Sequence, residues 1–231
     1  MKETCRNHKP ERVIYELDPS YWINRDIDTY YYTQLFNYMS WSGVKAEYFL
    51  AKITSADFRT VLFPWFNYQL QWKSNLANIE LKKTENYKNY GLDTFDLPYQ
   101  TLKEEGFLFV KDTKRAKSQY ISLWDEGKIL NNSYRYFDKI VSFCIENDIE
   151  LLVFTTPVPQ ETLELYPENY QKANQYFSKM MNEYGITYYN FNYIKLDGFD
   201  KSLAGYSDYD GHMFGDTAGS FSKSLGSYVK K

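Results

Sequence analysis

The feature that most constrains the fold is a nearly continuous apolar run at residues 149–154, with the sequence IELLVF, which ends in Thr155-Thr156-Pro157. A strand that is apolar on both sides is buried on both faces, as in a parallel sheet covered by helices. The run therefore predicts a central strand of such a sheet.

The segments around this run alternate between helical and strand patterns. A helical pattern at residues 167–184 is followed by Gly185, a residue suited to a helix C-cap. Such an alternation of helices and strands predicts parallel βαβ units and an α/β fold. The periodic patterns place helices at residues 131–147, 167–184 and from 215 onward, and further strands at residues 12–18 and 186–191.

The composition argues against several classes of function. A net charge of −3 disfavours nucleic-acid binding, and no stretch approaches the roughly 18 apolar residues of a transmembrane helix. Two cysteines are too few for a disulfide framework or a zinc site. The 24 tyrosines, 16 phenylalanines and 5 tryptophans have two explanations, the codon bias of an AT-rich genome or a surface on which aromatic rings stack on sugars.

One of the two histidines is the centre of the predicted chemistry. His8 lies in the polar N-terminal tail and has no predicted role, whereas His212 lies in the loop before the last helix. In an open α/β sheet, loops at the carboxyl ends of strands form the ligand crevice. Residues i and i+2 of an extended segment point to the same side, so Asp210 is expected to orient the His212 ring, with Asp208 as the alternative orienter. His212 would then act as a general base.

Two other interpretations of this loop remain open. Asp208, Asp210 and His212 could ligate a divalent metal, but no second cluster completes the coordination shell. We therefore predict neither a metal nor a cofactor. The loop could also be a surface segment that only caps the last helix.

Three blocks resemble the SGNH/GDSL hydrolases, in particular the bacterial cell-surface branch related to O-acyl transfer on polysaccharides and teichoic acids. Residues 8–18 (HKPERVIYELD) look like the family's third strand with the turn before it. Residues 150–159 (ELLVFTTPVP) look like its fourth strand and the following proline loop. Residues 208–218 (DYDGHMFGDTA) are similar to the final block, which carries the catalytic Asp and His.

The last block departs from the commonest family pattern. The position three before the histidine is Tyr209 instead of Asp, and Asp210 matches a variant found in alginate-acetylation relatives. Phe214 stands where the family usually has Asn. The Gly-(Asp/Ser)-Ser motif of the family is missing and is expected upstream of residue 1, so no serine of this chain is assigned as the nucleophile.

The resemblance implies a three-layer sandwich with a flavodoxin-like parallel sheet, of which strands three to five are present. We accordingly predict one N-terminally incomplete domain over residues 1–231, with residues 28–130 as an aromatic-rich, mainly helical insertion. Thr155 and Thr156 are expected to contact the substrate. In the family strand order 2-1-3-4-5, the strand at residues 12–18 would have an unpaired outer edge. A second copy, a partner chain, part of the insertion or the missing N-terminus is expected to cover that edge.

Two functions from different classes follow from these observations. The chain is expected to be part of an esterase or O-acyltransferase that acts on acylated cell-envelope carbohydrate, and to be inactive in isolation because the serine block is missing. The alternative is a non-catalytic module of the cell envelope that binds carbohydrate or protein. The resemblance implies a location at the bacterial cell surface, either free or anchored to the membrane outside the cytoplasm.

Overall fold

The computed structural model describes residues 1–23, 29–54, 58–63, 66, 73, 76, 79–80, 83–85, 97–103 and 107–229. The chain divides into two compact units, residues 1–10 with 26–93 and residues 11–25 with 94–231. Residues 94–130, which the sequence assigned to the insertion, cluster with the second unit. Other parts of the predicted insertion lie outside the described residues.

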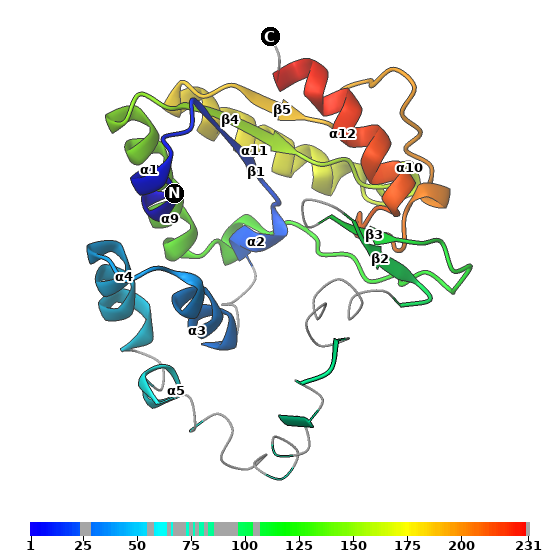
Figure 1. Ribbon diagram of the computed structural model, residues 1–231. Helices are drawn as coiled ribbons and strands as arrows, with labels where there is room; N and C mark the ends of the chain where they lie inside the picture. Colours follow the sequence, from blue (N-terminus) through cyan, green and yellow to red (C-terminus); the bar gives the residue numbers. More distant parts are fainter. Residues whose placement is uncertain are drawn as a thin grey trace. The chain divides into compact units, whose positions relative to one another are not determined.

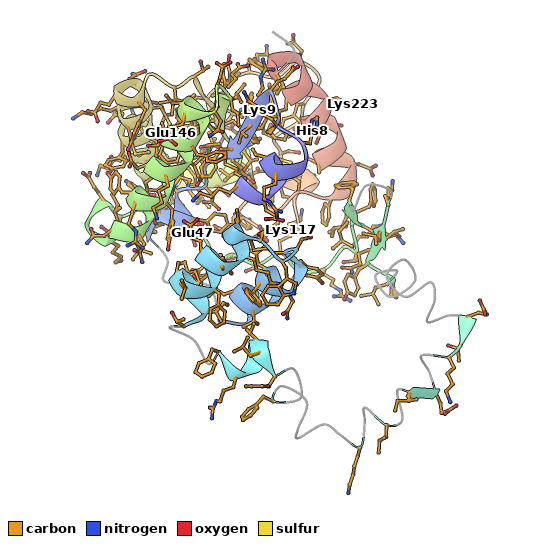
Figure 2. The ribbon with its side chains drawn as sticks, turned by 60° about the vertical axis from the view of Figure 1, so that its left-hand side comes forward. His8, Lys9, Glu47, Lys117, Glu146 and Lys223 are labelled. Carbon is orange, nitrogen blue, oxygen red and sulfur yellow. The ribbon has the colours of Figure 1, made fainter. Side chains whose placement is uncertain are left out.

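The first unit is helical in its described part. Its buried apolar residues are Phe36, Ile53 and Val61. Lys2 forms an ion pair of 2.9 Å with Glu47, which Figure 2 labels. The helices are α1 (Lys2–Asn7), α3 (Thr29–Tyr38), α4 (Gly43–Tyr48), a π-helical turn at Phe49–Ile53 and α5 (Arg59–Leu62).

The second unit is built on a parallel three-stranded sheet (Figure 1). Its strand order is β1 (Arg12–Glu16), β4 (Glu150–Thr155) and β5 (Tyr188–Asn190). Val13 lies opposite Leu151 in the register of β1 and β4, and Val153 lies opposite Tyr188 in that of β4 and β5. The predicted α/β class and the central position of the apolar run are therefore confirmed.

Helices cover both faces of this sheet (Figure 1). Alternate residues of β4 point to opposite faces. Val153 packs against α9 (Asn131–Glu146) and α11 (Pro167–Tyr184), while Leu152 and Phe154 pack on the side of α12 (Gly215–Val229). Gly185 closes α11 in the left-handed conformation, with φ 68°, as the sequence predicted.

Shorter elements complete the second unit. Within the described residues, no helix is long and apolar enough to cross a membrane. The elements are α2 (Ser20–Ile23), the antiparallel pair β2 (Gln100–Leu102) and β3 (Leu108–Val110), the 3-10 helix η4 (Glu126–Lys128), α10 (Gln160–Leu165) and the 3-10 helix η5 (Leu203–Gly205).

Strand β1 lies at an edge of the three-stranded sheet. The Leu17 N–H donates to the Phe154 carbonyl at 2.7 Å, so the odd-numbered residues turn their backbone groups toward β4. In a parallel ladder the intervening residues, Ile14 among them, turn theirs to the other side. In the part of the chain that the structure describes, no strand pairs with that side of β1.

Candidate functional site

The loop between η5 and α12 carries the predicted histidine and both predicted orienters. Backbone hydrogen bonds close it at both ends: Ser207 N–H donates to the His212 carbonyl at 2.8 Å, and Phe214 N–H donates to the Gly205 carbonyl at 2.9 Å. Gly211 has a φ of 112°, and a Cβ atom at this position would lie 3.2 Å from Val158 Cγ1. Both the backbone angle and the close contact favour glycine here.

Asp208 organises this loop and holds the histidine ring. Its Oδ1 accepts the backbone N–H groups of Asp210, Gly211 and His212 at 3.0, 3.1 and 3.2 Å. Its Oδ2 lies 2.8 Å from Nδ1 of His212. The Asp208 side chain is 18% exposed and that of His212 is 74% exposed. The carboxylate therefore fixes the ring by Nδ1, and Nε2 has no hydrogen-bond partner among the described residues.

The carboxylate that contacts the His212 ring is that of Asp208, the alternative that the sequence offered, and Asp210 points elsewhere. Asp210 Oδ1 accepts the backbone N–H of Ser122 at 2.8 Å. The expectation for Asp210 assumed an extended backbone, in which residues i and i+2 share a side. The chain instead wraps around the Asp208 carboxylate, because that group accepts three successive N–H groups.

Neighbouring segments hold the loop against the end of the sheet. Thr162 Oγ1 donates to the Tyr209 carbonyl at 2.7 Å, and the Tyr206 hydroxyl donates to the Pro157 carbonyl at 3.2 Å. Lys117, labelled in Figure 2, donates from Nζ to the carbonyls of Leu203 and Tyr206. These bonds anchor the backbone on both sides of Asp208, so the position of the Asp208–His212 pair depends on the packing of the whole carboxyl edge.

A small cavity lies at the carboxyl end of the sheet. Its volume of about 60 Å³ has room for a few water molecules. Asp210, Thr155 and Thr156, three of the predicted site residues, line it, and Asp208 and His212 do not. The structure therefore divides the predicted site into a pair, the largely buried Asp208 with the exposed His212, and a polar cavity.

The two threonines of this cavity bind other strands with their hydroxyl groups. Thr155 Oγ1 donates to the Leu17 carbonyl at 2.7 Å and lies 2.8 Å from the Tyr188 hydroxyl. Thr156 Oγ1 donates to Glu16 Oε1 at 2.8 Å. These bonds therefore tie the chain at the end of β4 to the ends of β1 and β5. A substrate contact would have to share the two hydroxyls with this structural role.

Asp18 is a cavity residue that the sequence interpretation did not select. Burial raises the pKa of its carboxyl group, and hydrogen bonds from Ser20 oppose the rise. The charge of Asp210 raises this pKa further, and that of His212 lowers it. Asp18 is the last residue of the predicted strand at residues 12–18, and the carboxyl ends of parallel strands meet at one edge, so its position was a usable signal.

Serine, tyrosine and asparagine side chains also contribute to the cavity's polar lining. Burial, together with the charges of Asp210 and Asp18, raises the pKa of Tyr170. Burial also raises the pKa of Tyr188 to about 12. Both hydroxyls therefore keep their protons at neutral pH. Among the residues that the structure describes, no three His, Cys, Asp or Glu side chains are placed to hold a metal ion.

Comparison with known proteins finds no matching family model, no matching curated protein and no matching solved structure.

Proposed function

We propose that the Asp208–His212 pair is the general-base half of an SGNH-type active site, in an esterase or O-acyltransferase that acts on acylated cell-envelope carbohydrate. The observation that carries the proposal is the 2.8 Å contact between Asp208 Oδ2 and His212 Nδ1, in a loop at the carboxyl edge of a parallel sheet. A carboxylate on Nδ1 fixes the ring and stabilises its protonated form, so Nε2 can remove a proton from a hydroxyl nucleophile.

The exposure of the His212 ring supports a general base that acts on a nucleophilic hydroxyl from another segment. The His212 side chain is 74% exposed, and no serine hydroxyl of the described residues is hydrogen-bonded to the ring. We assign the nucleophile to a segment that pairs with the free side of β1. Such a strand would extend the sheet toward the flavodoxin-like order of a three-layer sandwich, and its carboxyl end would reach the same edge as Asp18 and His212.

The chemistry of the proposed reaction assigns a role to each member of the pair. Nε2 of His212 takes the proton of the nucleophilic hydroxyl as that oxygen attacks the ester carbonyl. It gives the proton to the leaving alcohol when the substrate's C–O bond breaks and the acyl enzyme forms. Asp208 stays ionised and stabilises the imidazolium that forms between these steps. The acceptor that resolves the acyl enzyme, water or a carbohydrate hydroxyl, decides between hydrolysis and transfer.

The proposal is tested in cells that encode the protein, by replacing single residues in the gene. The measured quantity is ester-linked acyl group on the envelope glycan, released by mild alkali. His212→Ala should abolish the protein's effect on that quantity. Asp208→Asn should lower the rate at which the protein changes this ester content by about 10²–10⁴-fold, the range typical of general-base systems. Asp210→Asn should change it far less, because Asp210 does not contact the ring.

His8→Ala is the matched control, because the chain has only two histidines. Circular dichroism of the purified variants verifies that each one folds. An ester content that is the same in cells with His212→Ala and in cells with the unaltered protein would overturn the proposal. A larger loss in Asp210→Asn than in Asp208→Asn would overturn the assignment of the orienter.

A further inference from the structure

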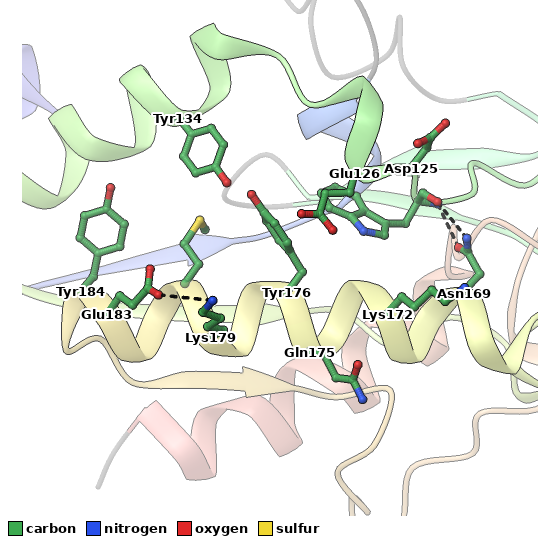
Figure 3. Close-up of a pocket in the computed structure, with 12 residues that line it drawn as sticks. Asp125, Glu126, Tyr134, Asn169, Lys172, Gln175, Tyr176, Lys179, Glu183 and Tyr184 are labelled. Atoms are coloured by element: carbon green, nitrogen blue, oxygen red, sulfur yellow. Dashed lines mark hydrogen bonds and ion pairs between the residues drawn. The ribbon is translucent and has the colours of Figure 1, made fainter.

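A second hollow of the second unit lies outside the proposed catalytic pair. It is a groove of about 810 Å³ between α11 and the segment that runs from Trp124 through η4 into the start of α9 (Figure 3). Its volume falls within the roughly 300–1,000 Å³ of typical ligand sites. The groove extends along α11 from Asn169 to Tyr184, a distance of about 22 Å at the helical rise.

Tyrosine side chains dominate the aromatic part of the groove. Tyr134 extends from α9, and Tyr176 and Tyr184 extend from α11, with the Tyr134 and Tyr176 hydroxyls directed toward the same space (Figure 3). Neither of these two hydroxyls has a hydrogen-bond partner in the described part of the chain. Burial and the carboxylates of Glu126 and Glu183 raise the pKa of Tyr134, so its hydroxyl stays protonated and can donate.

The rings are fixed by packing on the core. Tyr134 meets Trp22 edge-on with a centroid separation of 5.4 Å, and Tyr176 lies 5.1 Å from Trp124. Tyr184 lies 5.5 Å from Phe137. Fixed amphipathic rings offer both an apolar face and a polar tip without the entropy loss of ordering a flexible side chain.

The charges that line the groove nearly balance. The lining holds three carboxylates, those of Asp125, Glu126 and Glu183, and two lysines, Lys172 and Lys179. Lys179 lies 4.0 Å from Glu183 on the same helix, and Asp125 lies 3.0 Å from Lys128. The carboxylates would repel a polyanion, and the lysines would repel a polycation. A neutral ligand with many hydroxyl groups can accept from the lysines and donate to the carboxylates while its apolar faces stack on the tyrosines.

The groove and the cavity at the carboxyl edge share a wall. Trp124 and Asn169 line both. They are tied by a reciprocal pair of hydrogen bonds, Trp124 N–H to Asn169 Oδ1 at 2.9 Å and Asn169 Nδ2 to the Trp124 carbonyl at 2.8 Å. A chain molecule in the groove would therefore end beside the cavity that Asp18 and Asp210 line.

We propose that this groove binds a neutral oligosaccharide chain, which stacks on Tyr134, Tyr176 and Tyr184 and is led toward the cavity at the carboxyl edge of the sheet. Tyr176 and Tyr184 are separated by two helical turns or slightly more, about 12 Å, which is comparable with the length of a disaccharide. The groove thus adds a binding site for several sugar units to the proposed acyl-transfer site. This inference rests on the proposed function and specifies a neutral oligosaccharide chain as the ligand.

The test is titration of the full chain with neutral hexasaccharides: cellohexaose, maltohexaose and N-acetylated chitohexaose. Polyglycerol phosphate serves as the anionic probe. At least one hexasaccharide should bind saturably in calorimetry and shift the backbone amide NMR signals of Trp124 and Tyr176. Tyr176→Ala should weaken binding about tenfold, the size of one lost ring contact. Tyr134→Phe keeps the ring packed on Trp22. It should weaken binding by a smaller factor than Tyr176→Ala, because only one hydroxyl group is lost.

Tyr166→Ala is the control for Tyr176→Ala, because Tyr166 is a tyrosine directly before α11 that does not line the groove. Binding of none of the three hexasaccharides would overturn the inference, as would equal binding by Tyr176→Ala or tighter binding of polyglycerol phosphate. His212→Ala should bind as the unaltered chain does. A loss of sugar binding and a loss of acyl chemistry are therefore separate outcomes.

Discussion

The two faces of the three-stranded sheet are covered to different extents. On the face toward α9 and α11, β1 contributes Tyr15 to the same cluster as Val153 of β4 and Tyr188 of β5. On the face toward α12, the cluster takes its strand residues from β4 and β5. Ile14 of β1, which points to this second face, is 45% exposed.

This difference shows that β1 is incompletely covered in two directions. No strand of the described residues pairs with its backbone on the side away from β4, and its Ile14 side chain toward the α12 face remains in contact with solvent. Unpaired edges and exposed apolar side chains are features by which strands recruit further chain. The comparison therefore supports β1 as the place where the segment with the proposed nucleophile would add.

The largest effect that we expect concerns the more deeply packed face. Phe177 is fully buried and contacts the rings of Trp22 and Trp124 at 5.2 and 4.8 Å. Phe177→Ala should lower the free energy of unfolding by about 3–5 kcal/mol, measured by urea denaturation. Ile145→Ala on the exposed side of α9 is the control, because Ile145 is 72% exposed and should cost less than about 0.5 kcal/mol. Similar costs for the two variants would refute the assignment of this core.

A pair of adjacent substitutions on β1 sharpens the comparison between the faces. Tyr15 packs on Phe137 with a centroid separation of 5.5 Å, so Tyr15→Ala should cost about 2–3 kcal/mol. Ile14→Ala should cost less than about 1 kcal/mol, because much of that side chain stays in water. A cost for Ile14→Ala that equals that of Tyr15→Ala and grows with protein concentration would show that a second copy covers this face in solution.

The smallest effect concerns the charge at the end of β1. The pKa of Asp18 is raised in the folded state, mainly by burial, so the folded state holds this proton more tightly than the unfolded chain does. Stability should then fall as the pH rises from the unfolded-state pKa of about 3.8–3.9 through the higher folded-state value. Asp18→Asn removes the charge and keeps an acceptor for Ser20 N–H, so it should raise stability at pH 7 and leave it nearly unchanged below pH 4. Urea melts of both proteins at the two pH values measure this difference, and a less stable Asp18→Asn at pH 7 would contradict the electrostatic argument.

The main elements of the second unit could be predicted from local patterns. The apolar run at 149–154 predicted a strand buried on both faces, and β4 lies at the centre of the sheet with Leu152 and Val153 buried toward opposite sides. Gly185 marked the end of α11, because the left-handed backbone conformation at a helix end favours glycine. Periodicity and capping act within a few residues, so the sequence by itself determines them.

The partner of the His212 ring was decided by tertiary structure. Both Asp208 and Asp210 were compatible with the spacing, and the choice depends on how the loop bends against Ser122, Val158 and Thr162. The tyrosine groove has the same origin, since Tyr134 and Tyr176 come from helices that are far apart in the sequence. The number and type of aromatic residues were visible in the sequence, but contacts across dozens of residues depend on packing, which no local pattern encodes.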